Sequence, residues 1–320
     1  MNTLSLEAIE ATLTAVEPFV RSTPTVSIPA DLVPGASSVT AKYELLQVTG
    51  TFKARGAMAN ALALDQEERA AGVTAVSAGN HAIATAFAAS RLGIDAKVVM
   101  TATAPTVRVE RCRAYGAEVV LAPDVHAAFE MMADLVETEN RTAIHPFEGL
   151  LTAAGTAGVG YELIRDATVL DAVIVPVGGG GLAAGVAAAV KLLAPACKVY
   201  GVEPEGADSM SRSLAAGSAQ RLARVDTVAD SLGAPMAMPI SFALCQQYLD
   251  DVVRVSDAEL VDAMRVQHQQ LGLAVEPACA ATLAAATGPL ATQLRGKHVG
   301  LIFCGSNMDP ASWFRLVDAH

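Results

Sequence analysis

The sequence predicts an α/β protein with two lobes, in which parallel sheets carry helices on both faces. Short β-rich runs alternate with Ala-rich helical stretches along most of the chain, which is the pattern of parallel βαβ units. The chain also has 320 residues, which exceeds the usual size of a domain with a single core. We therefore expect a substrate cleft between two packed lobes.

A small α/β lobe is predicted over residues 72–148. It contains three β-rich runs, each followed by a stretch with helical spacing, as expected for successive strand and helix pairs. The runs are 73–77, 96–100 and 118–121, and the helical stretches are 82–92, 106–115 and 126–139.

The large lobe is predicted over residues 1–71 and 149–320. Most of its predicted strands are continuously apolar, which is typical of strands buried on both faces of a parallel sheet. These strands are 172–177, 198–202, 252–255 and 299–304. The stretch 207–239 has no strong period, and we expect a long loop there beside the active site.

Composition excludes several classes of protein. The chain has 22 Lys and Arg against 33 Asp and Glu, and it lacks a basic run that could neutralise phosphates in series, so nucleic acid is not expected as a partner. No apolar run approaches the roughly 20 residues that span a bilayer, so no membrane association is expected. The N-terminus carries acids where a signal peptide carries bases, which predicts a cytoplasmic protein. Its five cysteines are scattered singly, so neither a zinc site nor a disulfide framework is predicted.

Lys53 is a candidate for covalent chemistry. It lies among small and apolar residues directly before an Ala-rich helical run. Partial desolvation disfavours the ammonium form, and the neutral amine can attack an aldehyde and later accept a proton. From this segment alone, an ordinary lysine at the start of a helix is the commoner case.

Four consecutive glycines form a candidate phosphate site. Gly178, Gly179, Gly180 and Gly181 follow the apolar run 172–177 and precede the helical stretch 182–193. Unpaired amides and the helix dipole converge at such a junction and favour an anion. The GxGxxG spacing is only half met and a Walker lysine is missing, so a monophosphate fits better than a dinucleotide. A flexible tight turn is the alternative.

Two further segments stand at predicted strand ends. The backbone amides of Ser77, Ala78, Gly79, Asn80 and His81 are suited to a substrate carboxylate, although Ser and Asn also commonly cap helices. Cys304 ends the last apolar run, where its thiol can contact a pyridine nitrogen as a neutral partner or simply pack as a buried cysteine.

Together with the segment from Lys42 to Gly56, these motifs resemble the fold-type II enzymes that depend on pyridoxal 5'-phosphate (PLP), in the threonine/serine dehydratase and serine racemase-like family. Their order and spacing cover nearly the whole chain. The resemblance implies the two-lobed tryptophan synthase β-like fold and PLP as the cofactor. It also implies an enzyme of the carbon–oxygen lyase class.

The resemblance assigns roles to individual residues. Lys53 matches the catalytic Schiff-base lysine, and Phe52 matches the aromatic residue that packs near the cofactor ring. Asn80 matches the group that bonds the 3'-oxygen, and Cys304 matches the Ser or Cys that faces the ring nitrogen. The four glycines match the phosphate loop, and the segment 77–81 matches the substrate-binding loop.

The implied reaction is removal of water from L-threonine or L-serine to give a 2-oxo acid and ammonia. Serine racemases of the family carry a second serine where this chain has Ala78, so dehydration is favoured over racemisation. Dehydration of another β-hydroxy amino acid, such as 3-hydroxyaspartate or phenylserine, stays an alternative. A serine racemase-like racemase and a non-catalytic PLP-binding protein are the remaining ones.

Some segments depart from the pattern of the family. Ala153–Thr156 replaces a usual Gly-Gln-Gly-Thr, and Ser231 stands where Gly is usual, so both are expected near the pocket. Glu203 and Ala207 match a site for a mono- or divalent cation in racemase-like members, but Ser209 replaces an acid there. Relatives are often dimers, and a homodimer is therefore expected.

Overall fold

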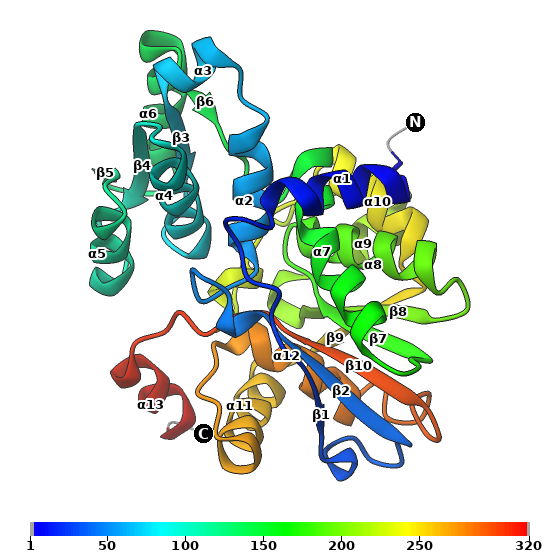
Figure 1. Ribbon diagram of the computed structural model, residues 1–320. Coiled ribbons are helices and arrows are strands. Elements are labelled where there is room, and N and C mark those ends of the chain that lie inside the picture. The colour runs from blue at the N-terminus through cyan, green and yellow to red at the C-terminus, as the bar shows by residue number, and fades with distance from the viewer. Residues whose placement is uncertain (1–2, 319–320) are drawn as a thin grey trace.

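The computed structural model describes residues 3–318, which form two separate sheets. Figure 1 shows the smaller sheet at the upper left and the larger sheet at the lower right, with helix α2 (Lys53–Leu62) between them. The strand order is β1-β2-β10-β7-β8-β9 in the larger sheet and β5-β4-β3-β6 in the smaller one. The expected α/β fold with two lobes is confirmed.

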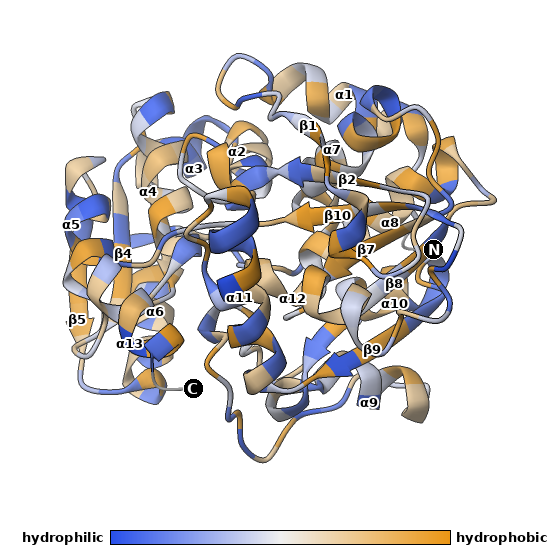
Figure 2. Ribbon diagram, turned by 90° about the horizontal axis from the view of Figure 1, so that it is seen from below, coloured by the Kyte–Doolittle hydropathy of each residue, from blue (hydrophilic) through white to orange (hydrophobic). Residues whose placement is uncertain are grey.

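The larger sheet is parallel from β2 to β9. Its strands are β1 (Thr25–Ile28), β2 (Ser38–Tyr43), β7 (Ala172–Pro176), β8 (Lys198–Pro204), β9 (Asp251–Val255) and β10 (His298–Phe303). Every residue of β7 is buried, and β7 and β10 are largely orange in Figure 2. These apolar central strands are the ones that the sequence predicted most clearly.

Strand β1 is the exception to the parallel order of the larger sheet. It runs antiparallel to β2, with Thr25 opposite Lys42 and Ile28 opposite Val39. The connection between these two strands is short, and antiparallel neighbours need no long crossover, so the chain simply turns back along the sheet edge. The sequence analysis predicted neither strand, because polar residues interrupt both.

Helices cover both faces of the larger sheet. Figure 1 shows α1 (Leu6–Val16), α7 (Leu150–Asp166), α8 (Gly181–Leu193) and α10 (Pro239–Tyr248) on one side, and α11 (Asp257–Leu271) and α12 (Pro277–Thr287) on the other. Helices α7 and α8 approach closely because glycines line their contact. A Cβ on Gly160 would lie 2.7 Å from the carbonyl oxygen of Val186. The last helix, α13 (Pro310–Asp318), packs on α11 through an edge contact of 4.8 Å between the rings of Trp313 and His268.

The smaller sheet is entirely parallel. Its strands are β3 (Val73–Val76), β4 (Ala96–Thr101), β5 (Glu118–Ala122) and the two-residue β6 (Thr142–Ala143). The helices α4 (Asn80–Leu92), α5 (Thr106–Ala114) and α6 (Val125–Glu139) follow β3, β4 and β5 in turn, as predicted, and α3 (Gln66–Ala71) precedes β3. Ala54, Ala57 and Met58 of α2 share one apolar cluster with α4, so part of the segment 1–71 packs on this lobe. The division of the chain at 71/72 and 148/149 stays a prediction.

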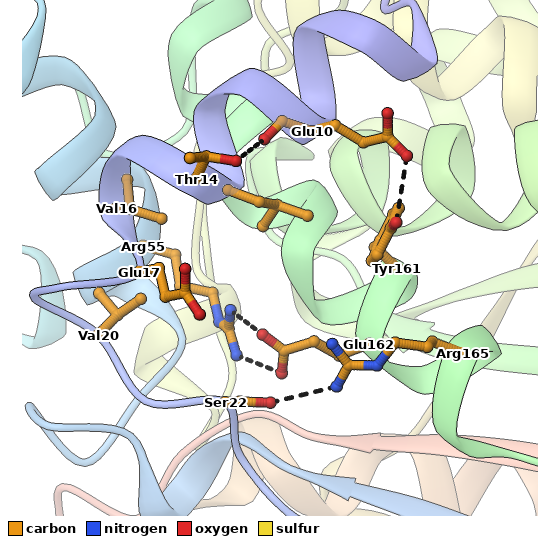
Figure 3. Close-up of a pocket in the computed structure, with 11 residues that line it drawn as sticks. Glu10, Thr14, Val16, Glu17, Val20, Ser22, Arg55, Tyr161, Glu162 and Arg165 are labelled. Carbon is orange, nitrogen blue, oxygen red and sulfur yellow. Dashed lines mark hydrogen bonds and ion pairs between the residues drawn. The ribbon is translucent and has the colours of Figure 1, made fainter.

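A network of buried ion pairs holds the start of α2 in place. Arg55 donates to the carboxylate of Glu44 at 2.9 and 2.8 Å and to that of Glu162 at 2.7 and 2.9 Å. Figure 3 shows the Arg55 and Glu162 side chains facing each other, in a cavity of about 360 Å³ between α1, α2 and α7. Lys42 of β2 also pairs with Glu162, at 2.7 Å. These ion pairs hold α2, and with it Lys53, against β2 and α7.

The predicted long loop is only partly irregular. Helix α9 (Ser209–Ala216) occupies its first part, which the sequence analysis missed because serines obscure the helical period. The carboxylate of Glu203 accepts hydrogen bonds from the amides of Met210 and Ser211, both at 2.8 Å, and so caps this helix from the end of the preceding strand, β8. The rest, 217–238, contains only a short 3-10 turn at Asp230–Leu232 and two bridging residues. Across residues 3–318, no helix combines the length and the apolar character that crossing a membrane requires.

Candidate active site

Lys53 lies at the start of α2, and its side chain is partly buried. Its Nζ donates to the carbonyl of Pro146 at 2.6 Å and lies 5.1 Å from the ring centroid of Phe52. Burial lowers the pKa of Lys53 to about 8, against the opposing effect of Cys304 and Glu276. The amine can therefore lose its proton close to neutral pH, as a nucleophile or base requires.

The glycine loop follows β7 directly and opens α8. Gly180 has a φ of +93°, which favours glycine. The ring of Phe147 lies against Gly179, where a Cβ would collide with it. Within residues 3–318, no hydrogen bond uses the amides of Gly178 to Gly181 as donors. These unsatisfied amides at a helix N-terminus fit a phosphate group.

The segment 77–81 opens α4 at the end of β3. The hydroxyl of Ser77 accepts a hydrogen bond from the Gly79 amide at 3.1 Å, while the amides of Ala78, Asn80 and His81 have no acceptor in the described part of the chain. The imidazole of His81 donates to the carbonyl of Ile144 at 2.7 Å. Burial, with a contribution from Lys53, lowers the pKa of His81 to about 3, so its ring is neutral. This segment would therefore bind a carboxylate through its backbone amides.

Asn80 connects the two lobes at the site. Its Nδ2 donates to both carboxylate oxygens of Glu276 at 3.0 Å and to Ser231 Oγ at 3.1 Å. Its Oδ1 accepts a hydrogen bond from Asn307 Nδ2 at 2.8 Å. The carboxamide of Asn80 is thus oriented by residues of the larger lobe. Its expected contact with the cofactor stays a prediction.

Glu276 is a site residue that the sequence analysis missed. It is 1% exposed and precedes α12, and it lines the same cavity as Lys53 and the glycine loop. Burial raises its pKa to about 7, against the hydrogen bond from Asn80. The only signal in the sequence is an isolated acid before Pro277 in an apolar stretch, which carries no motif spacing.

Cys304 follows β10 and is buried. A hydrogen bond with Cys279, together with burial, raises the pKa of the Cys304 thiol well above its ordinary value, so the group is neutral. One enclosed cavity brings together the predicted cofactor residues from four distant segments. They are Phe52, Lys53, Asn80, Gly178, Gly179, Gly180, Gly181 and Cys304.

A second cavity of about 300 Å³ adjoins the first, and Lys53, Asn80 and Gly179 line both. Its walls include all five residues of the predicted substrate segment and several that the sequence analysis did not single out. The latter are Arg108, Phe129, Pro146, Phe147, Asp230, Gly233, Ala234 and Pro235. These come from loops and helices far apart in sequence, so only the fold brings them together.

The remaining expected residues lie in different surroundings. Ser231 lines both cavities, as expected. Ala153 and Ala154 belong to the apolar core inside α7, while Thr156 donates to the carbonyl of Gly181 at 2.7 Å and so supports the glycine loop. Thr156 also lines a small cavity beside Lys53.

The expected cation residues lie in the interior of the protein. Glu203 and Ala207 are both buried, and burial raises the pKa of Glu203 to about 7. Its carboxylate accepts hydrogen bonds from two amides of α9. Among residues 3–318, no group of three or more His, Cys, Asp or Glu side chains is arranged to hold a metal ion. The cation site stays a prediction.

The donor set fits PLP. Free amides at the glycine loop suit its phosphate, the amine of Lys53 suits its aldehyde, and a neutral thiol lies in the same cavity. Comparison with known proteins agrees with this assignment. A family model described as pyridoxal-phosphate dependent enzyme matches residues 16–305.

Individual relatives match over most of the chain. A phenylserine dehydratase of Ralstonia pickettii is 52% identical over 311 residues, covering 97% of this chain and 95% of the relative. An L-threonine ammonia-lyase of Thermotoga maritima is 38% identical, covering 84% of this chain and 67% of the relative. The structure of maize serine racemase superposes with a TM-score of 0.93 at 32% identity, covering 99% of this chain and 98% of that one. The chain therefore belongs to the family of pyridoxal phosphate-dependent enzymes, with the fold-type II architecture that its motifs predicted.

Proposed function

We propose that this chain is a PLP-dependent dehydratase, a carbon–oxygen lyase that converts β-hydroxy amino acids to 2-oxo acids and ammonia, and that phenylserine is its preferred substrate. The observation that carries the proposal is the position of Lys53. Its amine, with a lowered pKa, lies between free amides suited to a phosphate and free amides suited to a carboxylate.

PLP, when bound, withdraws electrons from the substrate Cα and so makes its hydrogen acidic. The amides of Gly178 to Gly181 and the dipole of α8 would hold the phosphate. The thiol of Cys304 is neutral and would not supply the charged partner that a carboxylate provides to the ring. The ring of Phe52 lies beside the lysine amine, with its centroid 5.1 Å from Nζ.

Lys53 is proposed to act as the base. In its neutral form, its Nζ accepts the proton from Cα and passes it to the departing hydroxyl group, which leaves as water while the electron pair left on Cα forms a double bond to Cβ. Water then replaces the substrate nitrogen, which gives the 2-oxo acid and ammonia. The carbonyl of Pro146, 2.6 Å from Nζ, orients the amine during this transfer.

Ala78 supports elimination over racemisation. Racemisation needs a second group that delivers a proton to the other face of Cα, and the methyl group of Ala78 cannot do so. His81 and His145 are nearby, but burial lowers their pKa values to about 3 and about 4, so neither ring carries a proton to donate near neutral pH. Lys53, which lines the substrate cavity, is the group that we propose as the base.

The substrate cavity supports an aromatic side chain over an acidic one. The basic side chains that line it are Lys53 and Arg108. Arg108 donates to Asp230 at 2.5 Å and to the carbonyl of Asn307 at 3.3 Å, so the side-chain carboxylate of 3-hydroxyaspartate would have to compete with these partners. The relative with 52% identity is a phenylserine dehydratase. Threonine and serine, which the motifs predicted, stay candidate substrates of the same reaction.

A panel of substrates tests this function. The purified protein, supplied with PLP, should release phenylpyruvate from phenylserine with a higher kcat/KM than 2-oxobutanoate from threonine, pyruvate from serine or oxaloacetate from 3-hydroxyaspartate. Chiral analysis of the remaining substrate should show no racemisation. Bound PLP without release of any 2-oxo acid would contradict the proposal and favour a binding protein.

A further inference from the structure

We propose that Phe129 of α6 is the specificity residue of the substrate cavity and binds the aromatic ring of the substrate. The inference deepens the proposed function and rests on it, because it assigns the preference for an aryl side chain to one residue. α6 lies on the smaller sheet, at the upper left of Figure 1.

Phe129 is an exposed aromatic residue at the cavity. It is 52% exposed, yet it lines the same cavity of about 300 Å³ as Lys53 and Ala78. A large apolar side chain exposed in a concave site marks a position where a ligand can cover it. The cavity volume is at the lower end of the range of roughly 300–1,000 Å³ that is usual for small-molecule sites.

Phe129 does not contribute to the core in the described structure. The apolar cluster beneath α6 contains Ala128 with Met131, Met132 and Leu135, and Phe129 belongs to none of the three clusters of residues 3–318. Packing of α6 on its sheet therefore does not explain this aromatic residue. Truncating it should leave the fold intact.

Other apolar residues also line this cavity. Pro146 and Phe147 come from the segment before α7, and Ala234 and Pro235 come from the irregular segment before α10. Phe129 lines the same cavity from α6 on the smaller sheet, whereas Ala234 and Pro235 belong to the larger lobe. An aromatic side chain attached to Cβ of a substrate at Lys53 would be covered from both lobes, and contacts between aromatic rings contribute beyond the area that they bury.

The helix offers a matched control. Val125 lies one turn earlier on α6 and is 61% exposed, but it is not among the residues that line the cavity. We compare the wild-type protein with Phe129→Ala and Val125→Ala, measuring kcat/KM for phenylserine and for threonine. Phe129→Ala should lower the ratio of the two values about 10-fold through KM for phenylserine, as expected for one lost aromatic contact. Val125→Ala should leave the ratio unchanged.

A binding measurement separates this inference from the proposed reaction. L-phenylalanine and L-alanine lack a β-hydroxyl group and cannot undergo dehydration, so calorimetry gives their Kd values on the PLP-loaded protein. The wild-type protein should bind L-phenylalanine more tightly than L-alanine, and Phe129→Ala should remove most of the difference.

The possible outcomes distinguish the two proposals. An unchanged substrate ratio and an unchanged Kd difference in Phe129→Ala would overturn the role of Phe129 while leaving the dehydratase intact. Equal losses for phenylserine and threonine would also overturn it, since they indicate a general structural role. Loss of the Kd difference in a protein that releases no 2-oxo acid would support Phe129 as the aryl contact and contradict the reaction.

Discussion

At the scale of single residues, the site depends on buried groups whose pKa values are moved by their surroundings. Lys53 and Glu276 lie in one cavity, and burial lowers the pKa of the lysine while it raises that of the glutamate. Both shifts favour the neutral form, because water is excluded from the cavity. The site thus offers an amine that is readily deprotonated and a carboxyl group that is readily protonated.

Glu276 makes the stability of the protein depend on pH. Its pKa is about 7 in the folded state and close to the ordinary 4.5 in the unfolded state, so the folded protein binds more protons between these values. The contribution of Glu276 to the free energy of unfolding should therefore fall as pH rises from about 4.5 through 7, while the lowered pKa values of His81 and His145 act in the opposite direction. Glu276→Gln removes this contribution, so the difference in the free energy of unfolding between the wild-type protein and the variant should change with pH, while Glu203, with a similar shift, contributes equally in both. Urea unfolding over this pH range checks it, and parallel curves for the two proteins would contradict it.

Some single residues of the site were predictable from the sequence and others were not. Lys53, the glycines and Cys304 belong to short segments whose order along the chain carries the resemblance. Glu276 stands alone in an apolar stretch, and its role depends on Asn80, which is brought next to it only by the fold. Phe129 is unremarkable in an amphipathic helix until the cavity beside it is known.

At the scale of elements, the junction of β7 and α8 is the most constrained part of the site. A Cβ on Gly179 would collide with the ring of Phe147. Gly179→Ala should lower the affinity for PLP by about 10-fold or more, because the loop must shift its amides, and overpacking should cost about 1–3 kcal/mol of stability. Spectroscopic titration of the apoprotein with PLP and urea unfolding measure the two effects.

Gly217 serves as the control for this substitution. Unlike Gly179, it has a positive φ, of 69°, and nothing lies within 4 Å of the position that a Cβ would occupy. Gly217→Ala should cost about 1 kcal/mol because of backbone strain, while the affinity for PLP stays as in the wild-type protein. An equal loss of PLP affinity in both variants would show that the contact with Phe147 does not matter.

Some strands and helices were predictable from the sequence, and others were not. The central strands β7 and β10 are apolar throughout and were predicted from that pattern. Strand β2 contains Lys42, which looks like a surface residue in the sequence but is fully buried and paired with Glu162. Helix α9 is capped by Glu203 at the end of β8 and not by the side chain of Asp208 directly before the helix, so the usual N-cap signal is missing from the sequence.

At the scale of the whole molecule, polar contacts join the two lobes around the substrate cavity. Arg108 and Arg111 of α5 reach Asn307, and Arg108 also pairs with Asp230. Asn80 also forms hydrogen bonds with Glu276 and Asn307. The two lobes were predicted from the alternation of strands and helices, but these contacts between residues more than 100 positions apart were not, since no local pattern encodes them.

Weakening one of these contacts should affect substrate binding more than stability. Asp230 is 53% exposed in its side chain, so its ion pair with Arg108 contributes only about 0–1 kcal/mol and is screened by salt. Asp230→Asn should raise KM for phenylserine several-fold with little change in kcat, because a larger fraction of molecules has its lobes apart. Raising NaCl from about 0.05 to 0.5 M should raise KM of the wild-type protein more than that of the variant. Identical salt dependence would contradict this role.

The central claim is that this chain dehydrates β-hydroxy amino acids with Lys53 as both cofactor anchor and base. The most direct test measures phenylpyruvate released from phenylserine by the PLP-loaded wild-type protein and by Lys53→Ala. We predict steady release by the wild-type protein and a loss of about 10⁴-fold or more in the variant, together with loss of the visible absorption of the lysine-bound cofactor. Release at the wild-type rate by Lys53→Ala, with its fold unchanged by circular dichroism, would contradict the account.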